Sequence, residues 1–293
     1  MNIVIVTNYY HPETVGAGMW VSQLAQDLKG RGHEVTVVTS FPSYPQGRIL
    51  DGYHNRVVHR EMVDGIDIIR TFTYATPRKS FWARFAAFGA FCLSAAPGYM
   101  RWRRRADVVY AILPPLPLGV PAWAIAKASG ARLVINVQDI YPDVAVALNY
   151  LRNPAVVAFF RRMERWIYRR ADRIVVISEG FRQNLLVKGV GPTKVDVVPN
   201  WADPDQIVPG CADNAFRRET GTNGELLVMY SGGLTHNADM EPIVAAASHL
   251  RGLPIRFAII GDGVQKQSLI DKAAATASDN VKFYPFQPIE RYG

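Results

Sequence analysis

Short apolar runs alternate along the chain with longer segments in which apolar residues recur at helical spacing. Residues 2–7 are apolar and β-branched, which is typical of a buried strand, whereas residues 19–30 follow a helical pattern. This alternation predicts an α/β fold with a parallel sheet. The strands expected in the first part of the chain are 2–7, 35–39, 57–63, 65–70, 108–111, 132–137, 173–177 and 195–198.

The alternation stops at a polar stretch, residues 203–224, and then restarts. We therefore predict two Rossmann-like, doubly wound domains, 1–205 and 226–293, joined by a linker at 206–225. Doubly wound domains typically hold about five or six strands, so the second domain is expected to be incomplete. Its expected strands are 226–230, 256–260 and 281–284, and its expected helices are 240–250 and 264–275.

Composition narrows the class of protein. Apolar residues make up 49% of the chain, which is enough for packed cores and argues against disorder. The two cysteines, Cys92 and Cys211, are too few for a disulfide framework or a cysteine zinc site, which favours a cytoplasmic location. The amino terminus lacks a basic leader, so we expect no signal peptide there.

Basic residues are clustered within a net charge of +8. The segment from Ser80 to Arg105 holds an uncharged, aromatic stretch, residues 85–100, between two groups of cations. As a helix this stretch would be roughly 24 Å long, shorter than the ~30 Å hydrocarbon core of a bilayer. We therefore predict contact with the inner membrane surface rather than a membrane span. The alternative is a buried helix with a basic end.

A second basic cluster contains Arg161, Arg162, Arg165, Arg169, Arg170 and Arg173. Clusters of this kind can face nucleic acid, anionic lipid or phosphorylated substrates. No nucleic-acid-binding motif accompanies either cluster, so nucleic acid is not an expected partner.

Two loops of the first domain carry candidate residues at strand ends, where α/β sheets bind ligands. In the turn 13–18, Gly16 and Gly18 would let the backbone approach a ligand; the alternative is a tight turn. In the segment 136–143, which leaves a strand, Asp139 could orient a hydroxyl or stabilise a developing positive charge. The alternative for Asp139 is a helix cap or an Asx-turn. Gln138 and Tyr141 stand beside it.

Three further candidate loops follow the expected strands 195–198, 226–230 and 256–260. If they bind no ligand, they are a polar hinge and flexible strand–helix connections. Their glycines, hydroxyls and one histidine could hold a pyrophosphate. The candidates are Asn200, Ser231, Gly232, Gly233, His236, Gly261, Asp262 and Gly263, with Phe286 placed to flank a nucleobase. If the two halves face each other, all five loops would border one cleft.

Taken in order, these loops resemble glycosyltransferase family 4, which has the GT-B fold. More narrowly, the chain is similar to bacterial exopolysaccharide enzymes, the colanic acid biosynthesis fucosyltransferases. The residues that carry the resemblance are Glu13–Gly18, Gln138–Pro142, Val175–Glu179, Val198–Trp201, Tyr230–Gly232, Ile260–Gly263 and Asn280–Phe283.

The resemblance implies transfer of a sugar from a nucleoside diphosphate donor, GDP- or UDP-linked, with retention at the anomeric carbon. It implies that the first domain binds a lipid-linked or oligosaccharide acceptor, through Gly16, Gly18, Gln138 and Tyr141, and supplies Asp139 as the catalytic residue. The second domain would bind the donor. No metal or other cofactor is expected, since backbone amides and basic side chains would neutralise the diphosphate.

The chain departs from the family pattern at three places. Gln138 stands where many relatives have a histidine. His236 and Asn237 stand where the family often has an arginine and a lysine. The acidic E-x7-E segment of the family is absent before Gly293, because Glu290 comes too early and has no partner. We therefore expect weak or no turnover from this chain.

Three other functions remain as alternatives. A catalytically inactive binding or scaffold protein built on the same fold at the membrane would also fit the sequence. A NAD-dependent enzyme is disfavoured because G-x-G-x-x-G is absent. Nucleic-acid binding would rest on charge alone.

Overall fold

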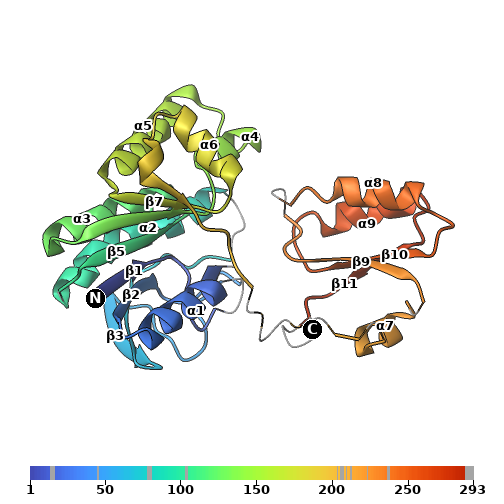
Figure 1. Ribbon diagram of the computed structural model, residues 1–293, viewed down its shortest axis with the longest axis horizontal. Coiled ribbons are helices and arrows are strands. Elements are labelled where there is room, and N and C mark those ends of the chain that lie inside the picture. Colours follow the sequence, from blue (N-terminus) through green and yellow to red (C-terminus); the bar gives the residue numbers. More distant parts are fainter. Residues whose placement is uncertain are drawn as a thin grey trace. The chain divides into compact units, whose positions relative to one another are not determined.

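The structure is a computed structural model that describes residues 1–13, 17–44, 46–77, 81–102, 105–202, 204, 208, 210–211, 213–222, 224–235 and 238–287. The chain forms two compact units, Met1–Trp201 (unit 1) and Ala202–Gly293 (unit 2). Each unit has its own sheet (Figure 1), so the expectation of two separate α/β units rather than one continuous sheet is confirmed.

The described part of unit 1 forms an eight-stranded sheet in the order β3-β4-β2-β1-β5-β6-β7-β8. All neighbours are parallel except β3, which forms an antiparallel hairpin with β4. The strands are β1 Asn2–Val6, β2 Glu34–Ser40, β3 Val58–Val63, β4 Ile66–Thr71, β5 Val108–Leu113, β6 Arg132–Val137, β7 Arg173–Val176 and β8 Val195–Val197.

Helices cover both faces of this sheet because the central strands are apolar on both sides. On one face, Val21 and Ala25 of α1 pack against Ile5 and Val37. On the other face, residues of α2, α3, α5 and α6 form a second buried layer with β5, β6 and β7. The helices are α1 Ala17–Gly30, α2 Phe81–Arg101, α3 Gly119–Ser129, α4 Asp143–Ala147, α5 Pro154–Arg170 and α6 Glu179–Val187, with short 3₁₀ helices η1 Leu116–Leu118 and η2 Pro192–Lys194.

Helix α2 occupies the segment that the sequence analysis assigned to the membrane surface. Its inner face is buried, with Phe91, Ala95 and Tyr99 fully inaccessible, whereas Leu93 is 81% exposed. One side of α2 is therefore buried, as the buried-helix alternative expects, but the other side has an apolar side chain in solvent. Among the described helices, none has the length and apolar character needed to traverse a bilayer.

Unit 2 contains the parallel strands β9 Leu226–Ser231, β10 Ile255–Ile260 and β11 Val281–Tyr284, in the order β11-β10-β9. Helices α8 Glu241–His249 and α9 Lys266–Ala275 cover one face (Figure 1), where Val244 and Leu269 pack against Phe257 and Ile259. All three strands and both helices were expected from the apolar pattern.

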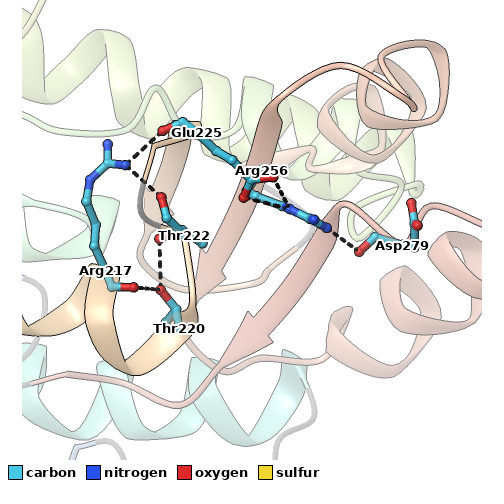
Figure 2. A network of polar contacts seen from close by, with 6 residues as sticks. All are labelled: Arg217, Thr220, Thr222, Glu225, Arg256 and Asp279. Carbon is cyan, nitrogen blue, oxygen red and sulfur yellow. Dashed lines mark hydrogen bonds and ion pairs between the residues drawn. The ribbon is translucent and has the colours of Figure 1, made fainter.

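The structure adds a helix, α7 Ala215–Thr220, within the stretch expected to be a linker. Asn214 caps it by accepting from the Arg217 amide at 3.0 Å. The Arg217 guanidinium then donates to the carbonyl oxygens of Thr222 (3.1 Å) and Glu225 (2.8 Å) (Figure 2). Because Glu225 also pairs with Arg256 of β10 at 2.9 Å, this network joins α7 to the sheet of unit 2.

Candidate active site

Amide and hydroxyl groups are linked in a row at the carboxyl edge of the unit 1 sheet. Asn136 Nδ2 donates to the Tyr110 hydroxyl at 2.5 Å, and Asn136 Oδ1 accepts from Gln138 Nε2 at 2.6 Å. Gln138 and Asn200 then pair side by side: Gln138 Nε2 donates to Asn200 Oδ1 (3.0 Å), and Asn200 Nδ2 donates to Gln138 Oε1 (2.7 Å). The structure thus brings together two predicted site residues that are far apart in sequence.

The segment Val198–Trp201, called the crossing segment below, passes over this edge. The Val198 amide donates to the carbonyl oxygen of Val176 at the end of β7 (2.8 Å). Asn200 contacts Gln138 beyond β6, and the Trp201 ring lies 5.6 Å from the Trp20 ring in α1 at an interplanar angle of 80°. The crossing segment therefore connects the outer strands to the helix that follows β1 (Figure 1).

Asp139 lies next to this row and is partly buried. Desolvation raises the pKa of its carboxyl above the ordinary value, because burial penalises the charged form. Among the described residues, no hydrogen bond or cation offsets that burial. Asp139 does not cap a helix: α4 starts after Pro142, so the alternative suggested by the sequence is not what the structure shows. A carboxylate of this kind can accept from hydroxyl groups of a ligand.

A partly buried ion-pair cluster fixes the end of the Asp139 loop. Lys188 Nζ lies 2.8 Å from Asp143 Oδ2 and 2.6 Å from Glu164 Oε1, and Glu164 is 2% exposed. Desolvation raises the pKa of the Glu164 carboxyl, although Lys188 opposes that rise. One lysine thus joins the start of α4, the middle of α5 and the end of α6. Tyr141, in the same loop, packs against the core.

The loop after β1 is organised by a buried carboxylate. Glu13 is 4% exposed and accepts from the amides of Ser43 (2.9 Å) and Tyr44 (2.8 Å). Desolvation raises its pKa, with the backbone amides acting in the opposite direction. A Cβ on Gly18 would overlap the Glu13 carbonyl oxygen, so glycine is required there for a contact within the protein. Gly16, the other glycine predicted to approach a ligand, lies outside the described residues.

The carboxyl edge of unit 2 is formed by backbone. The Gly232 amide donates to the Ile260 carbonyl (3.0 Å), and the Leu234 amide donates to the Asp262 carbonyl (2.9 Å). The two loops approach so closely that a Cβ on Gly261 would overlap the Gly232 carbonyl oxygen. Ser231 ends β9 in the same edge. The predicted glycine loops therefore lie side by side, and glycine at 261 is required for this contact within the protein.

All but one of the remaining predicted residues of unit 2 lie in the described part of the chain. The Asp262 carboxylate accepts from the Gly263 amide at 2.8 Å. The Gly233 carbonyl accepts from the Tyr230 hydroxyl at 3.1 Å. Phe286 is 50% exposed. His236 lies outside the described residues.

Sequence reasoning did not anticipate several contacts at the unit 1 edge. Asn136 belongs to the candidate segment 136–143, but its hydrogen bonds to Tyr110 and Gln138 depend on the fold. Trp20 gave no signal, because a tryptophan in the first turn of a helix has the pattern of a core residue. Glu13 carried part of the family resemblance, but its hydrogen bonds to residues 43 and 44 depend on the fold.

The sequence of the chain matches a known protein family. The glycosyl transferase 4-like domain family matches residues 15–201, which is more than half of the chain. The chain belongs to this family. The resemblance stated from the loop residues is therefore confirmed.

This glycosyl transferase 4-like chain is similar in sequence to two bacterial proteins. It is 28% identical to the Escherichia coli K12 protein WcaI, named as a glycosyl transferase of colanic acid biosynthesis, over 98% of this chain and 72% of that protein. It is 28% identical to the Pseudomonas aeruginosa glycosyltransferase WbjE over 58% of this chain and 44% of that protein.

Solved structures confirm the fold at the level of two α/β units. Sucrose-phosphate synthase from Thermosynechococcus elongatus superposes with a TM-score of 0.70 at 15% identity, covering 99% of this chain and 71% of that one. Anabaena HepE in complex with UDP-glucose gives 0.64 at 14% identity, covering 99% and 70%. The predicted GT-B fold is therefore confirmed.

Proposed function

We propose that this chain transfers a sugar from a nucleoside diphosphate donor to a lipid-linked or oligosaccharide acceptor in exopolysaccharide biosynthesis, with retention at the anomeric carbon. The observation that carries the proposal is the glycine-built edge of unit 2, where Gly232 and Gly261 bring two loops into contact at the carboxyl end of a parallel sheet. Membership of the glycosyl transferase 4-like family and the UDP-glucose held by HepE support the same chemistry.

In this proposal unit 2 binds the donor and unit 1 binds the acceptor. Unit 2 binds the donor through Ser231, Gly232, Gly233, His236, Gly261, Asp262, Gly263 and Phe286. The amides of Gly232, Gly261 and Gly263 already donate to groups within the protein. The Gly233 amide has no such acceptor among the described residues, so it can donate to a pyrophosphate without needing a cation. The proposal assigns no metal ion or other cofactor. Unit 1 binds the acceptor, with Gln138 and Tyr141 near the reacting hydroxyl, and it contributes Asn200 to binding of the donor sugar.

Asp139 is proposed as the catalytic residue. Its carboxylate is partly desolvated and has no cationic partner among the described residues, so it is available to a ligand. There it would orient the acceptor hydroxyl or stabilise positive charge that develops at the anomeric carbon. Such stabilisation is strongest when the group is held in place before reaction. The Lys188 cluster at the end of the same loop supplies that rigidity.

We further propose that α2 rests on the cytoplasmic face of the inner membrane. Phe85 (40% exposed) and Leu93 (81% exposed) present apolar side chains. The Phe85 ring also contacts Phe160 of α5, so the apolar surface extends onto a helix that ends in arginines. Apolar side chains beside cations suit the boundary of an anionic bilayer.

Isothermal titration with GDP and UDP, followed by a radiolabelled sugar-transfer assay on lipid-linked acceptors, tests the proposal. We expect nucleotide binding that is abolished by Gly261→Val, together with transfer that falls about 100-fold or more in Asp139→Asn. Nucleotide binding without transfer to any acceptor would favour the inactive binding or scaffold protein. Absence of nucleotide binding would reject the donor role of unit 2.

A further inference from the structure

Two tryptophans meet at the carboxyl edge of unit 1, and none of the interactions described above requires them to be there. Trp201 is 39% exposed at the end of the crossing segment, and its ring meets the partly buried Trp20 ring edge to face at 5.6 Å. Tryptophan is usually among the most buried residues, since it has a large apolar area to remove from water. Trp20 packs against the core on one side, so the exposed ring of Trp201, beside it at the proposed acceptor-binding edge, is informative.

The position of the pair links it to the polar row. Asn200 precedes Trp201 and is hydrogen-bonded to Gln138, whose next neighbour is Asp139. Amides, a carboxylate and two aromatic rings are thus held on one short stretch of the edge. Each of these groups can contact a ligand that has both polar and apolar parts.

The charge at this edge indicates what kind of ligand it suits. Neither the loop 138–143 nor the crossing segment contains a lysine or arginine, and the first cation of α1 is Lys29 in its last turn. Arg70, near the loop after β1, is fully buried and occupied by Glu61 and two carbonyl oxygens. A phosphorylated group would find no cation in these segments, so the edge suits a neutral ligand.

A pyranose ring has the chemistry that fits. Its hydroxyl groups lie around the rim and can donate to Asp139 or exchange hydrogen bonds with the amides. Its faces present C–H groups, which are apolar and can stack on an aromatic ring. We infer that Trp201 and Trp20 form a stacking platform for a neutral sugar ring, held at its rim by Gln138, Asn200 and Asp139. This inference rests on the proposed function and names the chemistry of its acceptor.

Fluorine NMR of the whole chain labelled with 5-fluorotryptophan tests the platform directly. The probes are methyl α-D-glucopyranoside, methyl α-D-galactopyranoside and methyl α-L-fucopyranoside, with glycerol as a hydroxylated compound that lacks a ring. We expect the Trp20 and Trp201 resonances to shift with at least one glycoside, with an affinity on the order of millimolar. Glycerol should move neither.

Trp102 is a matched internal control. It is 38% exposed, almost the same as Trp201, but it follows the carboxyl end of α2 and its ring lies 5.6 Å from the Arg60 guanidinium of the edge strand β3, away from β6 and the crossing segment. Its resonance should not respond to the glycosides. An equal shift at Trp102, or no shift at Trp20 and Trp201 with any glycoside, would overturn the platform.

Two substitutions separate stacking from simple packing of the crossing segment. Trp201→Leu keeps an apolar side chain but removes the ring, and we expect it to weaken glycoside binding about tenfold. Trp201→Phe should restore most of that loss. Circular dichroism checks that both variants are folded. Unchanged affinity in a folded Trp201→Leu variant would show that the ring is not a binding surface.

A parallel titration with UDP and GDP distinguishes this inference from the proposed function. Nucleotide binding with no glycoside response at Trp201 rejects the platform and leaves the donor role of unit 2 intact. A glycoside response without nucleotide binding supports the platform and rejects the donor role.

Discussion

The two units carry their candidate sites at the same edge of a parallel sheet but build them from different parts of the chain. In unit 1 the edge is formed by side chains, with Gln138 and Asn200 paired across 62 residues of sequence. In unit 2 it is formed by backbone, with Gly232 and Gly261 so close that a methyl group would not fit between them. Side-chain amides and carboxylates discriminate hydroxyl patterns, whereas backbone amides bind phosphate oxygens without regard to the rest of the ligand.

This contrast shows where each unit is sensitive to substitution. An edge made of side chains depends on buried partners behind it, such as Asn136 and the Lys188 cluster. An edge made of backbone depends on glycines, because a side chain at such a position would separate the two loops. Four substitutions test this difference, and they are given from the largest expected effect to the smallest.

Lys188→Met should destabilise unit 1 by about 3–5 kcal/mol, because Glu164 would remain buried without its cation. The pKa of Glu164 is already raised in the folded state. Its contribution to stability is therefore present below the unfolded pKa and is lost as the pH rises through the folded pKa. The deficit of Lys188→Met, measured by urea unfolding, should accordingly be smaller below about pH 4 than at neutral pH.

The double variant Lys188→Met, Glu164→Gln provides the control for that measurement. It removes the unpaired charge and should recover most of the stability with little remaining dependence on pH. A deficit in the single variant that does not change with pH would mean that Glu164 is not the cause.

Gly261→Ala should destabilise unit 2 by about 2–3 kcal/mol, because the new Cβ overlaps the Gly232 carbonyl and the backbone must shift. Hydrogen exchange should accelerate in β9 and β10 and remain unchanged in β1 and β5. Gly233→Ala is the matched control in the same loop, since the nearest atom to its Cβ would be Thr235 Cγ2 at an ordinary 3.6 Å. Equal effects of the two substitutions would contradict the close approach.

Asn200→Ala should cost about 1 kcal/mol, since it removes two hydrogen bonds at a solvent-accessible edge. The loss should appear as faster exchange of the Val198 amide, which is bonded to Val176. A double-mutant cycle with Gln138→Ala should give a coupling of about 0.5–1 kcal/mol. Strict additivity would show that the two amides do not act together.

Asp139→Asn should raise stability slightly, by a few tenths of a kcal/mol, while transfer activity falls about 100-fold or more. The folded pKa of Asp139 is raised by desolvation, so its ionised form is disfavoured in the folded protein. The gain should therefore appear at neutral pH and vanish below the unfolded pKa of an aspartate. Thermal unfolding at both pH values measures it, and a loss of stability at neutral pH would contradict the assignment.

Much of the fold could be predicted because parallel strands are continuous apolar runs with clear ends. The bounds of β6 and β11 agree with the sequence pattern. Helix α7 could not be predicted from its sequence, because it is short and polar and depends on Arg217 and on the ring contact between Phe216 and Tyr284.

Only those parts of the candidate site that have a local sequence pattern could be predicted. Glycines in the loops after β9 and β10 are visible locally, and their positions indicated the unit 2 edge. The pairing of Gln138 with Asn200 and the meeting of Trp20 with Trp201 depend on the path of the crossing segment over the sheet. No local pattern in the sequence indicates that path.

The two cysteines differ in a way that gives each unit its own spectroscopic reporter. Burial raises the pKa of the Cys92 thiol to about 12, whereas Cys211 of unit 2 is exposed. A maleimide dye should therefore attach to Cys211 without removal of Cys92, since the thiolate is the reacting species. All six tryptophans lie within residues 1–201, so tryptophan fluorescence reports on unit 1 alone while the dye reports on unit 2. Acceptor and donor occupancy can thus be followed in one cuvette at two wavelengths.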